Sequence, residues 1–291
     1  MILPPDILRR VLELEDIPTL PAVMNRILEI VADESASTND LAGVLECDHA
    51  VSTQVLRMAN SAFYGAPAEI DSIRRAVVLM GFDSVQMLAL ATSVIDVFAG
   101  RRQFALDAED FWMHSLGAAK AAHLLARRHV PTVSADAAFT AGLLHDVGKF
   151  LLAMALGSDY RKVLEEGQRD VRPVWEVERD RLGATHGDLG GWICLKWHFP
   201  PVVIASITYH HHPSAAACTH PREAALVCLA NEVSRAAGFG LAGDAPGLRT
   251  SLEDPAAMLC IATSIVDDMI EEMADMREQA QAFLGQVRAK V

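Results

Sequence analysis

The sequence lacks the signatures of several protein classes. Its five cysteines form no Cys-x-x-Cys pair and are odd in number, which argues against a disulfide framework and against a zinc ribbon. No apolar run approaches the roughly 18–20 residues that a membrane span requires. The first residues show neither the basic nor the apolar region of a signal peptide. We therefore expect a protein of the reducing cytoplasm that has no contact with a membrane.

Positive charge is also scarce. The 291 residues include 25 Lys and Arg against 38 Asp and Glu, a formal net charge of −13. Such a surface repels phosphate backbones, so broad nucleic-acid binding is disfavoured. Residues 39–58 have the spacing of a helix-turn-helix, but Asp40, Glu46 and Asp48 oppose a single Arg57. Because a recognition helix needs several cations, a DNA-binding regulator is the least favoured interpretation.

Strand-like alternation is nearly absent, and aromatic residues make up only 6% of the chain. Apolar residues recur instead at helical spacing throughout, which predicts an all-α protein. At roughly 150 residues per domain, the length corresponds to about two domains, or to one body with two lobes. The pattern of breaks predicts a first lobe that ends near Gly100 and a second that begins at Asp107.

Short polar residues mark where several helices should begin. We expect caps at Thr19, at Ser37 with Asp40, at Asp48 and at Ser134. The helix that follows Ser134 is expected to run into residues 142–149. A last helix should cover about residues 255–289, capped by Asp254, with an apolar stripe that packs on the bundle or on a second copy of the chain.

Several His and Asp residues fall on the inner faces of these predicted helices. An apolar face is an unfavourable place for so many imidazoles, and one bound metal would satisfy them together. Imidazole and carboxylate ligands suit iron, zinc, manganese or nickel. Such an ion can generate hydroxide from water and polarise a phosphoryl group. The residues are His114, His145, Asp146, His186, His210 and His211.

Any one of these histidines alone is more often a core residue bonded to a neighbour. The adjacent His145 and Asp146 reverse that balance, and for the set as a whole we favour a metal site or its remnant. Gly148 is expected to let the backbone turn beside them. Lys149 either contacts a phosphate or acts as a cation near a helix C-terminus. The other histidines are interpreted as surface or packing residues.

The segment Leu-Leu-His-Asp-Val-Gly-Lys (143–149) resembles the signature of the HD superfamily of metal-dependent phosphohydrolases. Further segments together resemble the HDOD domain, the HD-related output domain of bacterial signalling proteins, over residues 17–213. They are Ile-Pro-Thr-Leu-Pro (17–21), Leu-Arg-Met-Ala-Asn-Ser-Ala-Phe-Tyr-Gly (56–65), Ile-Arg-Arg-Ala-Val-Val-Leu-Met-Gly (73–81), Phe-Trp-Met-His-Ser (111–115) and Ala-Gly-Leu-Leu-His-Asp-Val-Gly (141–148).

The resemblance implies an all-α, two-lobed fold with an HD-like bundle in the second lobe. We accordingly expect a lead-in helix over residues 1–16, an N-terminal lobe over 17–100 and an HD-like lobe over 101–213. The C-terminal helices of residues 214–291 should pack on the HD-like lobe.

The resemblance also implies ligand roles. The superfamily pattern maps onto His114, His145 and Asp146, and the later histidines of its cyclic-dinucleotide branch map onto residues 186, 210 and 211. Two departures disfavour hydrolysis. Asn231 stands where the superfamily closes its site with an Asp, and the Gly-Tyr-Pro signature is missing after residues 210–213. Neither departure removes the metal-binding histidines.

Two functions follow as hypotheses. The first is a non-catalytic signalling module that contacts other signalling proteins, set by a nucleotide ligand or by a metal. The second is a metal-dependent phosphohydrolase of nucleotide or cyclic-dinucleotide type, with His145, Asp146 and Lys149 as the catalytic candidates. No receiver, cyclase or sensor segment is recognisable, so we expect the input to come from a separate protein or a small ligand. The last helix could also form a homodimer.

Overall fold

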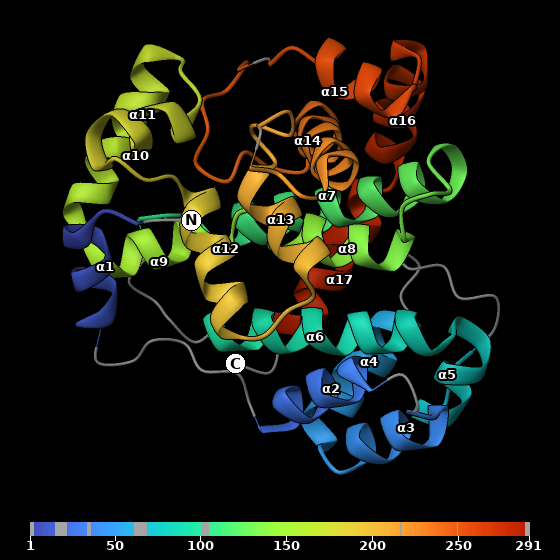
Figure 1. Ribbon diagram of the computed structural model, residues 1–291. Coiled ribbons are helices and arrows are strands. Elements are labelled where there is room, and N and C mark those ends of the chain that lie inside the picture. Colours follow the sequence, from blue (N-terminus) through green and yellow to red (C-terminus); the bar gives the residue numbers. More distant parts are fainter. Residues whose placement is uncertain are drawn as a thin grey trace. The chain divides into compact units, whose positions relative to one another are not determined.

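The computed structural model describes residues 3–14, 22–33, 36–60, 69–99, 105–215, 217–248 and 250–288. These residues form 17 α-helices and no strand, so the predicted all-α fold is confirmed (Figure 1). The chain divides into two compact units. The larger unit comprises Met1–Ile17 and Arg101–Arg277, and the smaller unit comprises Pro18–Gly100 and Glu278–Val291.

The smaller unit begins its helices where short polar residues predict them. Ser37 and Asp40 form a reciprocal capping box, and Asp48 accepts hydrogen bonds from the first backbone amides of the next helix. The expected cap at Thr19 lies outside the described residues. The helices are α2 (Ala22–Ala32), α3 (Thr38–Glu46), α4 (His49–Ala59), α5 (Ile73–Met80), α6 (Phe82–Ala99) and α17 (Arg277–Arg288).

Asn60 ties the end of α4 to the segment before α5. Its side-chain amide donates to the carbonyl of Ile70 at 2.6 Å, and its side-chain oxygen accepts from the amide of Ile70 at 2.7 Å. This two-way bond satisfies both backbone groups of a buried residue. It gives a structural reason for the asparagine of the 56–65 segment, whose residues 61–65 lie outside the described part of the chain.

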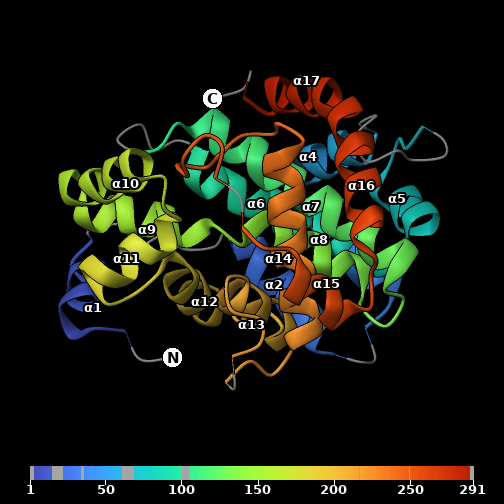
Figure 2. The ribbon, with the colours of Figure 1, turned by 90° about the horizontal axis from the view of Figure 1, so that it is seen from above.

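The larger unit is a bundle around the long helix α7, which packs on α8 and α14 (Figures 1 and 2). Helix α12 packs on α9 and α13, and α1 packs on α9. The helices are α1 (Pro5–Leu12), α7 (Ala108–His129), α8 (Ala135–Leu144), α9 (Val147–Leu156), α10 (Ser158–Asp170), α11 (Val174–Leu182), α12 (His186–Lys196), α13 (Pro201–Tyr209), α14 (Pro221–Ala236), α15 (Glu253–Leu259) and α16 (Thr263–Asp275).

The helix expected to run from Ser134 into residues 142–149 ends inside that segment, and a second helix follows it. Helix α8 ends at Leu144 and α9 begins at Val147, so the turn is made by His145 and Asp146. Gly148 does not make that turn, because it lies inside α9. A Cβ at Gly148 would stand 1.9 Å from the carbonyl oxygen of His186. The glycine therefore allows α9 and α12 to touch backbone to backbone.

The prediction of one long helix over residues 255–289 is also wrong, because three helices cover this part of the chain. Cys260, with a positive φ of 59°, ends α15, and α16 ends at Asp275 before α17 starts. The N-cap of α15 is Leu252, and Asp254 lies in the first turn instead of capping it. Helices α15 and α16 pack on α14. Apolar periodicity continues across these breaks, so it could not reveal them.

One segment among the described residues, Ala135–Leu156, is long and apolar enough to cross a membrane by length and composition alone. It comprises α8, α9 and their junction. Because 89% of its apolar window is buried inside the protein, neighbouring helices already cover it, as they would cover any core segment.

We predict that Gly148→Ala destabilises the larger unit by about 1–3 kcal/mol, because the added Cβ forces α9 away from α12. The matched control is Gly43→Ala in α3, where nothing lies within 4 Å of an added Cβ. There the higher helix propensity of Ala should be neutral or stabilise by up to about 1 kcal/mol. Thermal unfolding measures both changes, and equal shifts would contradict the backbone contact.

Candidate metal centre

All six predicted donor residues converge in the larger unit. His114 comes from the middle of α7, His145 and Asp146 from the turn between α8 and α9, and His186 from the first residue of α12. His210 and His211 directly follow α13. The start of α12 is fixed by a capping box between Thr185 and Asp188, which sets His186 at the edge of the cluster.

The donors form two groups that share Asp146. On the side of its Oδ2 atom, His145 Nε2 lies at 3.4 Å and His114 Nε2 at 3.8 Å. On the side of its Oδ1 atom, His186 Nε2 lies at 3.0 Å and His210 Nε2 at 3.9 Å. His211 joins the second group, with its Nε2 atom 2.9 Å from that of His186. Each group offers at least three ligand atoms within 4.8 Å of one another.

Hydrogen bonds on the far side of four rings fix how those rings face the cluster. The Nδ1 atoms of His114, His145 and His210 lie 3.2, 2.7 and 2.7 Å from backbone carbonyl oxygens. A carbonyl only accepts, so each Nδ1 must carry the proton and donate. The Nδ1 of His186 is likewise 2.7 Å from a carboxylate oxygen of Glu178. In each of these rings that is neutral, the Nε2 lone pair therefore points inward, as in metal-bound histidines.

This arrangement fits a metal ion better than it fits an ion-free core. Ligand atoms about 2.1 Å from one ion and about 90–110° apart lie about 3.0–3.4 Å from each other. The Nε2 atoms of His114 and His145, both lone-pair acceptors, face each other at 3.3 Å. Asp146 Oδ1 and His210 Nε2 are buried with no hydrogen-bond partner of acceptable geometry. A cation between the donors would satisfy these atoms.

The electrostatics keep most of the cluster in its metal-binding form. Burial, reinforced by His145, lowers the pKa of His114 to about 3. Burial and the neighbouring rings also lower the pKa of His210 and His211 well below the ordinary value. Burial alone would raise the pKa of Asp146, but His145 and Lys149 outweigh it and hold that pKa well below 3.8. Neutral rings and an ionised carboxylate are the forms that bind metals.

His186 is the exception among the rings. Burial lowers its pKa, but the carboxylates of Glu178 and Asp146 outweigh burial and raise the pKa to about 9. The environment of this ring therefore favours a positive charge. A metal ion would supply that charge in place of the proton.

Lys149 lies in the first turn of α9, not near a helix C-terminus, and its side chain is buried. Its ammonium group donates to Asp146 Oδ2 at 2.8 Å and to the carbonyl of Ala242 at 3.1 Å, and lies 3.8 Å from Asp244. Burial alone would lower its pKa, but Asp146 and Asp244 raise it. In this position Lys149 neutralises buried carboxylates and does not face a solvent-borne phosphate.

Glu178 is a functional residue that the sequence analysis missed. One carboxylate oxygen accepts from both the backbone amide and Nδ1 of His186 at 2.7 Å, and the other accepts from the hydroxyl of Tyr160 at 2.6 Å. Glu178 lies on α11 beside the buried Val174 and Val177. A carboxylate on that apolar stripe was the signal that could have revealed it.

The loop that follows α14 was also missed. The carbonyl of Gly240 accepts from His114, the carbonyl of Ala242 accepts from Lys149, and Asp244 accepts from the backbone amide of Val174 at 3.0 Å. Asp110, one turn before His114, holds this loop by accepting from the amides of residues 241 and 242 at 2.8–3.1 Å. Loop and helix thus position His114 together.

Asn231 is buried on α14, and its side-chain oxygen has no hydrogen-bond partner. Ser234, one turn later, donates to the backbone carbonyl of His114 at 2.8 Å. Residues three apart share a helix face, so Asn231 lies on the face of α14 that meets α7 near His114. The residue at which the resemblance predicts a closing Asp is thus a buried neutral amide.

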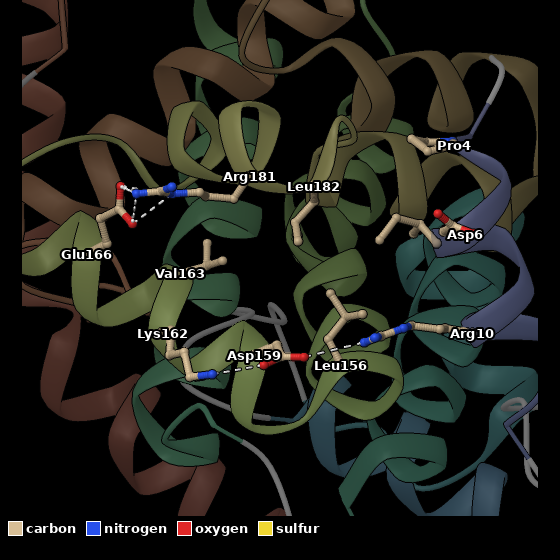
Figure 3. Close-up of a pocket in the computed structure, with 11 residues that line it drawn as sticks. Pro4, Asp6, Arg10, Leu156, Asp159, Lys162, Val163, Glu166, Arg181 and Leu182 are labelled. Atoms are coloured by element: carbon tan, nitrogen blue, oxygen red, sulfur yellow. Dashed lines mark hydrogen bonds and ion pairs between the residues drawn. The ribbon is translucent and has the colours of Figure 1, made fainter.

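A separate pocket of about 570 Å³ lies between α1, α10 and α11 (Figure 3). The charged side chains at its rim form ion pairs with one another. Asp159 contacts Arg10 at 3.6 Å and Lys162 at 3.0 Å. Arg181 and Glu166 form a further pair at 3.0 Å on the same rim.

The HDOD domain family model matches residues 17–213, so the chain belongs to the HDOD domain family. An uncharacterised protein of Treponema pallidum (strain Nichols) is 26% identical over 203 residues, which cover 68% of this chain but only 38% of that protein. The chain therefore spans well under half of the length of this relative.

Solved structures show the same fold. An HDOD domain protein of Geobacter sulfurreducens, 23% identical, has a TM-score of 0.79 and covers 94% of this chain and 97% of its own. A candidate phosphohydrolase of Shewanella amazonensis SB2B, 24% identical, has a TM-score of 0.74 and covers 98% of each chain. At these identities the similarity extends to the fold alone.

We predict that Asp110→Ala lowers the affinity of the His114-containing group for Zn²⁺ by about 10–100-fold, since His114 loses a fixed partner for its Nδ1 proton. Asp107→Ala is the matched control, because Asp107 caps the same helix without bonding the loop. It should cost about 1 kcal/mol of stability and leave Zn²⁺ affinity unchanged. A competitive chelator titration measures both Zn²⁺ affinities. Equal effects of the two changes would rule out a role of Asp110 in positioning His114.

Proposed function

We propose that this protein is a bacterial signalling module whose buried HD-type centre binds a divalent metal and that acts through contacts with other signalling proteins, without catalysis. The observation that carries the proposal is the inward convergence of the Nε2 atoms on Asp146, with Nδ1 of four rings bonded to the protein. Nitrogen donors with one carboxylate suit iron, zinc, manganese or nickel.

Burial supports a closed centre. Five of the six donor residues are at most 1% exposed, and His211 alone is partly exposed. A catalytic metal keeps a position open for water or substrate, whereas a structural metal is enclosed by protein ligands. Asn231 in place of a carboxylate further weakens the case for hydrolysis, since it leaves the site one negative charge short.

A metal in this position would link four separate segments of the larger unit. These are the middle of α7, the turn between α8 and α9, the start of α12 and the end of α13. Metal binding would therefore stabilise one arrangement of those helices over others. Such a change of helix arrangement is a physical route from metal or ligand state to a surface that a partner protein contacts.

A metal-dependent phosphohydrolase is the second candidate, and the sharing of Asp146 favours it. Two donor groups, one on each carboxylate oxygen, provide for two neighbouring ions. Paired ions clamp the attacking and leaving oxygens in phosphoryl transfer.

The decisive experiment is elemental analysis of protein purified without a chelator or histidine tag. We expect near-stoichiometric iron, zinc, manganese or nickel in the wild type and in His129→Ala, a control at the exposed end of α7. His145→Ala should lose the metal, because His145 is one of the three donor residues of the first group. His211→Ala, at the partly exposed edge, serves as a second variant if His145→Ala does not fold.

Metal-free wild-type protein that takes up none of these ions on dialysis would overturn the metal centre. Metal-loaded protein is then assayed with bis(p-nitrophenyl) phosphate, AMP and a cyclic dinucleotide. We expect no turnover. Turnover that disappears in both His145→Ala and Asp146→Ala would replace the signalling proposal with the phosphohydrolase.

A further inference from the structure

The metal centre has one edge that meets solvent among the described residues, and that edge is His211. Its ring is partly exposed, whereas the other five donor residues are buried. Trp175 of α11 stacks on this ring, with centroids 5.4 Å apart and planes 27° apart. A small molecule that approaches the centre from this side meets Trp175 and the side chains around it.

Arg179 lies one turn after Trp175 and is held in place twice. Its guanidinium carbon lies 4.4 Å above the ring of Trp175, a cation–π contact. Its Nη2 atom donates to Nε2 of His212 at 2.7 Å, and His212 packs edge-on against Trp175 at 4.5 Å. An arginine fixed in this way loses little conformational freedom when it binds a ligand.

The charge of Arg179 is left available. Arg172 and Arg181 each pair with a carboxylate, Asp180 at 2.7 Å and Glu166 at 3.0 Å. Within the described part of the chain no carboxylate pairs with Arg179. Two acidic side chains whose charges act on His212 are engaged elsewhere: Glu176 pairs with Arg172, and Asp188 caps α12.

We infer that Arg179, held by Trp175 and His212, is an anion-binding residue at the solvent edge of the metal centre, and that it recognises a phosphoryl group on a small molecule. The inference rests on the proposed metal centre and names the chemistry of its ligand. A guanidinium presents a planar fork that matches phosphate oxygens.

The location suits selective binding. The protein carries a net charge of −13, so its surface as a whole repels phosphates. An exposed arginine without a carboxylate partner beside the metal centre makes the electrostatic potential there locally less negative. It would concentrate small anions at this edge without attracting the extended backbone of a nucleic acid, which needs many cations.

The test is calorimetric titration of the full chain, loaded with its metal, with inorganic phosphate and with AMP. Arg179→Ala should weaken phosphate binding by about tenfold or more, the usual effect of losing a charge-assisted hydrogen bond. The matched control is Arg181→Ala on the same helix, whose guanidinium is already paired with Glu166 (Figure 3). It should change phosphate affinity by less than about twofold.

The outcomes separate cleanly. Equal phosphate affinity in the wild type and Arg179→Ala, or no phosphate binding by the wild type, overturns the inference even if metal is present. Tighter binding of AMP than of phosphate identifies an ester as the ligand, and equal binding identifies free phosphate. If elemental analysis finds no metal, the same titration on metal-free protein still tests Arg179. Arg179→Gln, which keeps a polar side chain with part of the aliphatic stem but removes the charge, replaces the Ala variant if the latter does not fold.

Discussion

The larger unit depends on one buried carboxylate. Asp146 presents one oxygen to His114, His145 and Lys149 and the other to His186 and His210. An ionised carboxylate is strongly disfavoured away from water unless charges or hydrogen bonds compensate it. Its neighbours supply that compensation from several helices, so Asp146 can be buried in its charged form only when those helices are assembled.

Close helix contacts make that assembly feasible. Gly148 lets the backbone of α9 meet that of α12, and Gly142 brings α8 to within contact distance of α7, where an added Cβ would lie 2.8 Å from the carbonyl of Ala118. Larger residues would separate the helices and the Nε2 atoms with them. The glycines of the 141–148 segment are therefore as necessary for the candidate metal centre as its donor residues.

The sequence predicted the helical class, several helix starts and the identity of the clustered residues, because these depend on local features. A cap such as Ser37 or Ser134 acts within one turn, and an inward histidine follows from helical periodicity. Glu178 left a local trace, a carboxylate on the apolar stripe of α11, but the roles of Gly240 and Asp244 could not be predicted in this way. Their roles arise from contacts with residues far away in the chain, and no local pattern encodes those contacts.

The hydrogen bonds around the cluster connect an enclosed site to the rest of the larger unit. Each ring bonded through Nδ1 relies on a different segment, including α11 through Glu178 and the loop after α14 through Gly240. Movement of a donor residue on metal binding would therefore displace segments that contain no metal-binding residue. Helix α11 bears both Glu178, which contacts His186, and Arg179, which faces solvent. A ligand on Arg179 and a metal on His186 would thus act on the same helix, and the two sites would be coupled if both ligands bind one arrangement of that helix more tightly than another.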